Sequence, residues 1–320
     1  MPLNDISFGI AAIRECIRLN KEYGIDIIQA HGIAVGPAAV ISAKLIKKPV
    51  AIMLDGTLSS YSKISGLYES IIYRLIKFNH YFIIDNGGPA LTVFQKLKNI
   101  KERFNPVFQN INTSRVYPKE KNLKLWNELG LGDKNRFVYI SIHNLDAIQG
   151  VDYSISGFKK LIDTYHVQDA ILLIVGGGPD RDRLENLAND SGLREKLIFS
   201  GPVDNSLVPD YYSVSNVALS TSIKINSNLA TIEAMACKIP VIAFECGNSA
   251  DLLMRHLENM ILVPNGSIEE LAKAMFQLYN DRGLGQKLGD NAREFIVTHR
   301  NWEERISTEL EVYSRLIKQR

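Results

Sequence analysis

The sequence predicts an α/β fold with two Rossmann-like lobes whose parallel sheets face each other across a cleft. Three observations support this fold class. Short apolar segments alternate with segments of helical length along both halves of the chain, which is typical of parallel βαβ units. The polar segment 113–121 (TSRVYPKEK), which contains a proline, separates the two halves. The length of 320 residues also allows two domains, each with its own core.

The first half of the chain contains four predicted strands. They are residues 25–30, 49–54, 81–84 and 104–108, and the predicted helices are 8–23, 35–46, 68–78 and 87–97. In the first helix Ile10, Ile13 and Ile17 recur at helical spacing with charged residues between them. Since a complete Rossmann-like lobe has about six strands, we expect a first lobe over 1–115 that is incomplete at its start.

The second half contains six predicted strands, which make a complete lobe over residues 116–301. They are 137–142, 170–175, 196–199, 217–220, 240–244 and 260–263, with helices such as 150–165 and 179–191 between them. Residues 302–318 form a predicted amphipathic helix whose apolar face needs a surface to cover. We therefore expect residues 302–320 to pack back on the first lobe.

Charge is unevenly distributed between the halves. Residues 1–115 hold 14 Lys and Arg against 8 Asp and Glu, a net charge of +6, whereas the remainder carries −4. A basic first lobe suits an anionic partner, such as phosphate groups or a membrane surface, and a solvated basic face is the equal alternative. We expect no nucleic-acid partner.

The cysteines and the hydropathy pattern favour a cytoplasmic protein. Cys16, Cys237 and Cys246 form no CxxC pair and have no metal-ligand spacing with the six histidines. No apolar run reaches the roughly 18 residues of a spanning helix, and the first residues do not resemble a signal peptide. We expect no metal, and a peripheral position on the cytoplasmic face of a membrane is a second possibility for the basic lobe.

Ligands of open parallel sheets bind outside the carboxyl ends of the strands. His31, Asp55, Asn144 and the triplet Gly176–Gly178 follow predicted strands. His31 and Asp55 could act as a general acid or base, but a hydrogen-bonded structural role is the default. The three glycines could bring backbone amides to a phosphate, yet a tight turn is the favoured interpretation.

Glu233 is the other candidate, because it lies on a helix of small residues beside an apolar sheet (IEAMA). A charge in such surroundings is costly unless it has a partner or a ligand. The carboxylate could accept two hydroxyl groups of a ribose, or it could be satisfied by backbone amides. From the residues alone these two roles are equally supported.

The second half also resembles the donor-binding lobe of family 4 glycosyltransferases, which have the GT-B fold. The segments that show this resemblance are IVGGGPDRDRLENLA, IFSGPV, VPDYYSVSNVALSTS, IEAMACKIPVIAF and ENMILVPNGSIEELAKAM. They are similar, in the same order, to the family's "lvGdGp…L", "ftG.v", "l..yy..advfvlpS", "lEAMAcGkPVia" and "nGllvp.gd.eeLa.ai" patterns. In the first half, IDIIQAHG, KKPVAIMLDG and VFQNIN resemble "pDvihaHg", "giPvv.tlHg" and "vipNGvd".

The resemblance implies retaining transfer of a sugar from a nucleotide-sugar to an acceptor, in the synthesis of a glycan or a cell-surface polysaccharide. It implies no cofactor, with a glycan, a lipid-linked molecule or a protein as acceptor. The second Glu of the family's E-x7-E signature binds the nucleotide ribose and corresponds to Glu233. Asn228, which the strand-end rule selects within 220–228, joins the donor site. His31 lies on the acceptor side, because it belongs to the segment IDIIQAHG.

Several positions depart from the family pattern. The first Glu of the signature is Ile225, and the Arg and Lys that hold the donor diphosphate are Asn144 and Gln149. The histidine near the reacting sugar is Asp55, which becomes the candidate catalytic residue. Losing preorganised charge at a leaving group is costly, commonly about 100- to 1000-fold in rate for one donor. We expect Lys224, Lys238 and the amides of the glycine triplet to compensate.

Two functions follow from these departures. The first is an active glycosyltransferase with an altered donor site. The second is an inactive GT-B scaffold that binds a partner glycosyltransferase or a glycan. The absence of the first signature Glu, the Arg, the Lys and the His favours this second function. A gene start placed too late would also account for the short first lobe.

Overall fold

The computed structural model describes residues 2–54, 74–76, 81–84, 104–106, 110–133, 135–223, 229–246 and 255–318. The chain divides into two compact units. Unit 1 comprises Met1–Gln109 together with Glu303–Arg320, and unit 2 comprises Asn110–Trp302. The predicted helix 87–97 and most of the predicted helix 68–78 lie outside the described residues, although residues 74–76 are helical.

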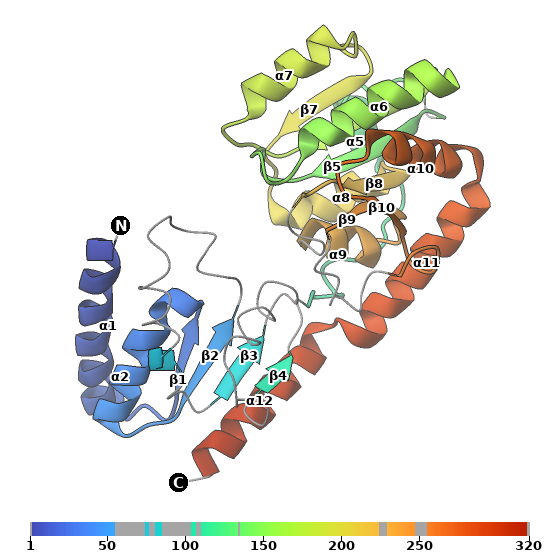
Figure 1. Cartoon of the computed structure of the whole chain (residues 1–320). Helices are drawn as coiled ribbons and strands as arrows, with labels where there is room; N and C mark the ends of the chain where they lie inside the picture. Colours follow the sequence, from blue (N-terminus) through green and yellow to red (C-terminus); the bar gives the residue numbers. More distant parts are fainter. Residues whose placement is uncertain are drawn as a thin grey trace. The chain divides into compact units, whose positions relative to one another are not determined.

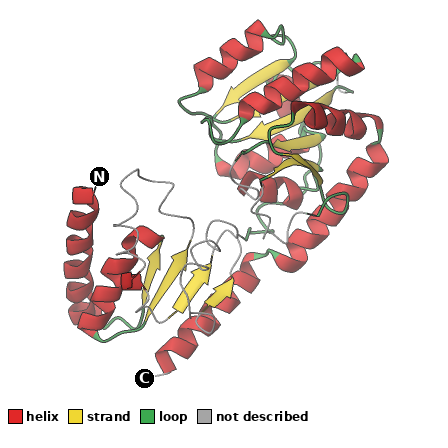
Figure 2. Cartoon of the chain, in the orientation of Figure 1, coloured by secondary structure: helices red, strands yellow, loops and turns green. Residues whose placement is uncertain are grey.

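A parallel sheet forms the centre of unit 1 (Figures 1 and 2). Its strands follow chain order: β1 (Ile28–His31), β2 (Val50–Leu54), β3 (Tyr81–Ile84) and β4 (Phe104–Pro106). Helix α1 (Pro2–Tyr23) precedes β1, and the short 3-10 helix η1 (Ile33–Val35) and helix α2 (Gly36–Ile46) connect β1 to β2. The strand predicted over 25–30 begins only at residue 28, because backbone pairing with β2 starts there, between Ile28 and Val50.

Helices cover both faces of this sheet. Successive residues of a strand point to opposite faces. Ile52 lies against the start of α2, whereas Ala51 and Met53 pack with Val312 and Leu316 of α12 (Trp302–Lys318). Because these contacts bury the two faces of β2, the strand can be apolar along its whole length, as parallel sheets require.

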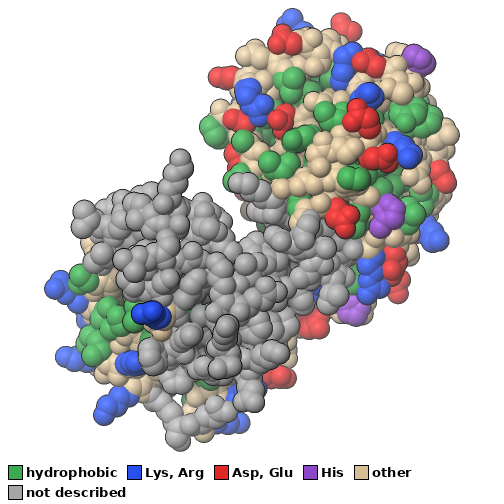
Figure 3. Space-filling view, in the orientation of Figure 1, with side chains coloured by type: hydrophobic (Ala, Val, Ile, Leu, Met, Phe, Trp, Pro, Cys, Tyr) green, Lys and Arg blue, Asp and Glu red, His purple; other side chains and the backbone are tan. Residues whose placement is uncertain are grey.

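Unit 2 contains a six-stranded parallel sheet in the order β10-β9-β8-β5-β6-β7. Its strands are β5 (Phe137–Ile142), β6 (Ala170–Val175), β7 (Leu197–Gly201), β8 (Val217–Ser220), β9 (Val241–Glu245) and β10 (Ile261–Pro264). The helices are α5 (Leu123–Glu128), α6 (Val151–Tyr165), α7 (Arg181–Asp190), α8 (Val208–Ser213), α9 (Leu229–Ala236), α10 (Ile268–Asn280) and α11 (Arg282–His299), with η4 (Asn205–Leu207) before α8. Figure 3 shows acidic and basic side chains interspersed over the surface of this unit.

The alternation of side chains along β5 divides the core of unit 2 into two layers. Phe137 and Tyr139 belong to the cluster that includes α6 and α10. Val138 and Ile140 belong to the cluster that includes α8, α9 and α11. None of the helices in the described part of the chain is both long and apolar enough to cross a lipid bilayer.

The chain enters and leaves unit 2 at one place. Trp302 Nε1 donates a hydrogen bond to the carbonyl oxygen of Asn110 at 3.1 Å, and Asn110 Nδ2 donates to the carbonyl oxygen of Asn301 at 2.7 Å. The amide of Ile111 donates to the carbonyl oxygen of Arg300 at 2.9 Å. The first and last residues of unit 2 are therefore fastened to each other.

Candidate functional site

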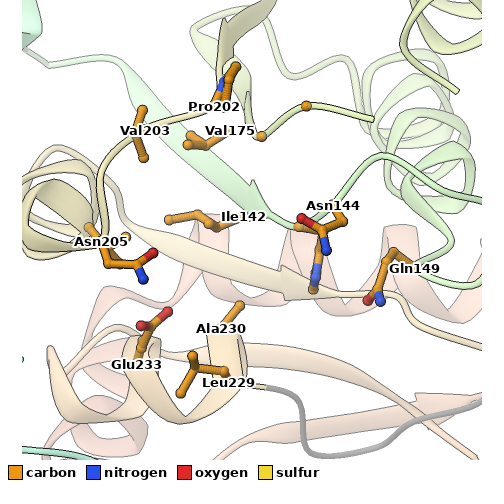
Figure 4. Close-up of a pocket in the computed structure, with 14 residues that line it drawn as sticks. Ile142, Asn144, Gln149, Val175, Pro202, Val203, Asn205, Leu229, Ala230 and Glu233 are labelled. Carbon is orange, nitrogen blue, oxygen red and sulfur yellow. The ribbon is translucent and has the colours of Figure 1, made fainter. Parts of the chain in front are cut away.

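A pocket of about 540 Å³ opens at the carboxyl edge of the unit 2 sheet (Figure 4). Strand order reverses between β5 and β8, and ligands of open α/β sheets bind at such a point. The pocket is lined by the ends of β5 and β6, the loop after β7, and the start of α8 together with α9. The lining residues are Ile142, His143, Asn144, Gln149, Val175, Gly176, Gly177, Pro202, Val203, Asn205, Val208, Leu229, Ala230 and Glu233.

Glu233 supplies the carboxylate of this pocket. Its side chain is only 8% exposed, and burial raises its pKa from 4.5 to about 7. Within the described residues no side chain or backbone group hydrogen-bonds the carboxylate, which points toward the side of the pocket that carries Asn205 (Figure 4). A carboxylate buried without a partner costs free energy, so Glu233 has the property of a ligand-binding group.

Helix α9 holds this carboxylate in place because the helix itself is buried. Four residues of α9 have no exposed surface: Ile232, Ala234, Met235 and Ala236. The Tyr212 hydroxyl donates to the carbonyl oxygen of Ala230 at 2.8 Å, and Thr231 Oγ1 donates to Ser220 Oγ at the same distance. These contacts leave α9 little freedom to rotate Glu233 out of the pocket.

Two amide side chains face Glu233 from the opposite wall. Asn144 follows β5 and is exposed, whereas Gln149 is partly buried. Gln149 Oε1, as the amide is assigned, has no hydrogen-bond partner although it is shielded from solvent. A buried polar atom without a partner is uncommon and indicates a place for a ligand group. These amides lie where the sequence resemblance expects the two cations of the donor site.

The loop that carries Gln149 is tied to the segment after β8. Gly150 lies so close to Thr221 that a Cβ atom on it would be 2.1 Å from the Thr221 carbonyl oxygen. Ser154 Oγ and Thr221 Oγ1 are 2.8 Å apart and fully buried. The amide of Ile223 also donates to the carbonyl oxygen of Ile148 at 3.2 Å. The position of Gln149 therefore depends on residues 221–223.

The glycine triplet forms a tight turn, as the sequence favoured. Gly176 has a φ of 139°, its amide donates to the carbonyl oxygen of Gly201, and a Cβ atom would lie 1.9 Å from the carbonyl oxygen of His143. At Gly178 a Cβ atom would lie 2.3 Å from the Leu145 carbonyl oxygen. Close packing therefore explains these two glycines. Gly177 has room for a side chain and lines the pocket.

Lys238 does not reach the pocket, which corrects its assignment to the donor site. It follows α9 with a φ of 61°, and its ammonium group lies 2.8 Å from Asp290 of α11. Because α9 ends at Ala236, the direction of the Lys238 side chain is not set by the helix that carries Glu233. His31 ends β1 in unit 1 and is exposed. Asp55, Lys224 and Asn228 lie outside the described residues, as does Ile225.

No lysine or arginine lines the pocket within the described part of the chain. His143 adds no charge, since burial lowers its pKa to about 4 and keeps the ring neutral. The pocket therefore combines one carboxylate, amide groups and apolar walls, a set suited to a ligand with hydroxyl groups and a flat apolar part.

Sequence reasoning did not single out Asn205, which begins the 3-10 helix η4 after β7 and faces the pocket (Figure 4). The rule that selected Asn144 would have found it, because Asn205 follows the carboxyl end of a strand by four residues.

The sequence profile of the family described as Glycosyl transferases group 1 matches residues 127–295, which is more than half of the chain. An uncharacterized glycosyltransferase of Haemophilus influenzae is 26% identical over 267 residues, covering 78% of this chain and 72% of the relative. N-acetyl-alpha-D-glucosaminyl L-malate synthase of Bacillus anthracis is 28% identical over 187 residues. That match covers 58% of this chain and about half, 47%, of the relative.

Among solved structures, that of Anabaena Alr3699/HepE in complex with UDP superposes with a TM-score of 0.82. The superposition covers 95% of this chain and 82% of that one at 18% sequence identity, so it is evidence on the fold alone. It confirms the expected GT-B fold.

Proposed function

Because the chain belongs to the glycosyl transferases group 1 family, we propose that it transfers a sugar from a nucleotide-sugar donor bound in the unit 2 pocket. The observation that carries the proposal is the carboxylate of Glu233, which is nearly buried and has no partner among the described residues. A ribose diol would supply two hydroxyl donors to it and relieve the cost of burial. UDP in the Anabaena structure is in keeping with a nucleotide ligand.

The walls suggest where the rest of a donor would lie. Val175, Pro202 and Val203 offer apolar surface for a nucleobase on one side of Glu233. Gln149 and Asn144 would donate neutral hydrogen bonds to the diphosphate on the other side. In the retaining reaction the bond between the anomeric carbon and the phosphate oxygen breaks, and a bond to the acceptor oxygen forms on the same face. The acceptor proton passes to the departing phosphate.

Neutral amides stabilise a departing diphosphate less than cations do, so we expect slow turnover. Charge-assisted hydrogen bonds are roughly twice as strong as neutral ones. Gln149→Lys should therefore raise the turnover number by about tenfold or more. A lower turnover number in this variant, with the donor still bound, would contradict the placement of the diphosphate. The reaction uses no metal in this proposal, so a chelator should leave the rate unchanged.

A thermal-shift panel of nucleoside diphosphates and nucleotide-sugars tests the proposal directly. Binding stabilises the folded state by an amount that grows with the logarithm of ligand concentration over Kd. We expect at least one nucleotide to raise the Tm of the wild type and Glu233→Ala to abolish most of that shift. The hits then enter transfer and hydrolysis assays with the wild-type protein.

A panel without any shift would refute the nucleotide site. Nucleotide binding without turnover on any donor would favour the inactive scaffold instead, and so would isolation of a stable complex with a second glycosyltransferase. An unchanged shift in Glu233→Ala would remove Glu233 from the site while leaving the pocket in place.

A further inference from the structure

His143 is a buried polar residue of the pocket that the proposed function does not use. It follows β5, is only 8% exposed, and lines the pocket together with Asn144 and Gln149. Its backbone is held from two sides. The amide donates to the carbonyl oxygen of Val175 at 3.0 Å, and Gly176 packs directly against the carbonyl oxygen. The imidazole ring is therefore attached to a part of the sheet edge that has little freedom to move.

The ring also has little space in which to turn. It borders a cavity of about 10 Å³ that is lined by Tyr212, Ala230 and Thr231, among others, and that is at the lower limit for a single water molecule. The ring nitrogen Nε2 lies 3.4 Å from the carbonyl oxygen of Leu219 in β8. A further partner for the ring therefore has to come from the open pocket.

These contacts determine which ring nitrogen carries the proton. Burial lowers the pKa of His143 from 6.5 to about 4, so the ring is neutral and holds one proton at pH 7. The carbonyl oxygen of Leu219 can only accept a hydrogen bond, so the proton belongs on Nε2. The other nitrogen, Nδ1, is then an acceptor, and no group in the described part of the chain donates a hydrogen bond to it.

We propose that Nδ1 of His143 accepts a hydrogen bond from a hydroxyl group of the sugar that the donor carries, an inference that rests on the proposed function. An ionised phosphate oxygen cannot be the partner, because it also only accepts hydrogen bonds. The ribose hydroxyls are assigned to Glu233, and the nucleobase to the apolar wall of Val175, Pro202 and Val203. The sugar is therefore the part of the donor whose hydroxyl groups still lack an acceptor.

This contact makes His143 a residue that selects the sugar rather than the nucleotide. A sugar with a hydroxyl group at this place gains a hydrogen bond, whereas a deoxy sugar leaves a buried acceptor without a partner. A neutral hydrogen bond changes affinity by about 3- to 10-fold. The sugar should therefore lose this much affinity when the acceptor is removed, and the nucleoside diphosphate alone should not.

Two substitutions separate the roles of the two ring nitrogens. In His143→Asn the side-chain oxygen can take the place of Nδ1, whereas in His143→Gln the amide reaches the place of Nε2 and leaves no acceptor at Nδ1. Isothermal titration calorimetry of the full chain compares UDP with UDP-glucose and GDP with GDP-mannose. We expect His143→Gln to weaken the nucleotide-sugar by about 3- to 10-fold relative to its nucleoside diphosphate. His143→Asn should keep the wild-type ratio.

His166 provides a matched control, because it is exposed and follows the end of α6 that lies away from the pocket. His166→Gln should leave all affinities unchanged. NMR of the ¹⁵N-labelled protein tests the protonation directly, and the spectrum of His143→Asn identifies the signals of this ring among those of the six histidines. We expect a proton on Nε2 alone, and a shift of the Nδ1 signal when the nucleotide-sugar binds.

Three results would overturn the inference alone. They are a proton on Nδ1 in the free protein, equal weakening of a nucleoside diphosphate and its nucleotide-sugar in His143→Gln, and the same loss in His143→Asn as in His143→Gln. Absence of binding by all four ligands to the wild type would refute the nucleotide site as well. The Tm of each variant shows whether it is folded.

Discussion

Nucleotide binding should depend on pH through Glu233. In the free protein burial raises its pKa to about 7, so the side chain is mostly protonated below that pH. Hydroxyl donors of a bound ribose favour the carboxylate and lower the pKa, so binding releases a proton. Affinity should therefore rise as the pH increases through 7 and level off above it.

The size of the effect follows from the two pKa values. If the bound nucleotide returns the pKa of Glu233 to its ordinary value of 4.5, affinity should increase about 30-fold between pH 5.5 and pH 8, which is about 2 kcal/mol. In Glu233→Gln the side chain has no proton to lose. Its profile should be flat, and its affinity at pH 8 about 10- to 100-fold weaker, as expected when a charged acceptor becomes neutral.

The same substitution should stabilise the protein without ligand. Between pH 4.5 and 7 the folded state binds a proton that the unfolded state has released, so the free energy of unfolding falls as the pH rises through this window. Glu233→Gln removes that loss and should raise the free energy of unfolding at pH 8 by about 1–3 kcal/mol. Weaker binding combined with higher stability is the signature of a functional carboxylate.

Isothermal titration calorimetry at several pH values, in buffers of different ionisation enthalpy, measures both the affinity and the released proton. Chemical denaturation at pH 5.5 and pH 8 gives the stability of the two proteins. A wild-type affinity that does not change with pH would refute the reasoning. So would a Glu233→Gln profile with the same slope as that of the wild type.

Three further predictions concern the pocket's surroundings. Gly176→Ala should lower the free energy of unfolding by more than about 3 kcal/mol, because the new Cβ atom would overlap a carbonyl oxygen, whereas Gly177→Ala should change it by less than about 0.5 kcal/mol. Denaturant titration measures both changes. Equal losses of stability in the two variants would contradict the packing argument. Thr221→Val leaves the buried Ser154 hydroxyl without its partner, so we expect the free energy of unfolding to fall by about 1–3 kcal/mol and nucleotide binding to weaken. Adding Ser154→Ala should restore part of the lost stability. Strictly additive effects in this double-mutant cycle would rule out the coupling. Lys238→Gly removes a side chain from a left-handed backbone position and should stabilise the protein by about 0.5–1 kcal/mol. Calorimetry should find its nucleotide affinity unchanged. Weaker nucleotide binding in this variant would return Lys238 to the donor site.

The elements predicted most closely from the sequence are those whose burial is uniform. Strands β5, β6 and β8 have the predicted bounds because every residue of β6 and β8, and nearly every residue of β5, is buried and polar segments flank them. Strand ends were less accurate elsewhere, since pairing with a neighbour decides them, as at β1. The short helices α5 and α8 have six residues each, too few to produce a periodic pattern.

The site was predictable only in part. The strand-end rule found Asn144 and the glycine turn, and the isolated carboxylate identified Glu233. Lys238 was misplaced because nearness in sequence to Glu233 was taken as nearness in space, although the helix ends between them. The hydrogen bond between Thr221 and Ser154 joins residues 67 positions apart, and no local sequence pattern predicts such a contact.

The discontinuous make-up of unit 1 also has a consequence for synthesis on the ribosome. Met53 packs against Leu316, which the ribosome adds 263 residues later. At a translation rate of roughly 5–20 residues per second, one face of β2 stays uncovered for about 13–53 s until the helix that covers it has been synthesised. All of unit 2 is synthesised during this time. A released chain that ends before α12 should therefore hold a folded unit 2 and a unit 1 whose sheet still exposes Ala51 and Met53. Of the two units, unit 1 is therefore the one that we expect to expose apolar surface during translation.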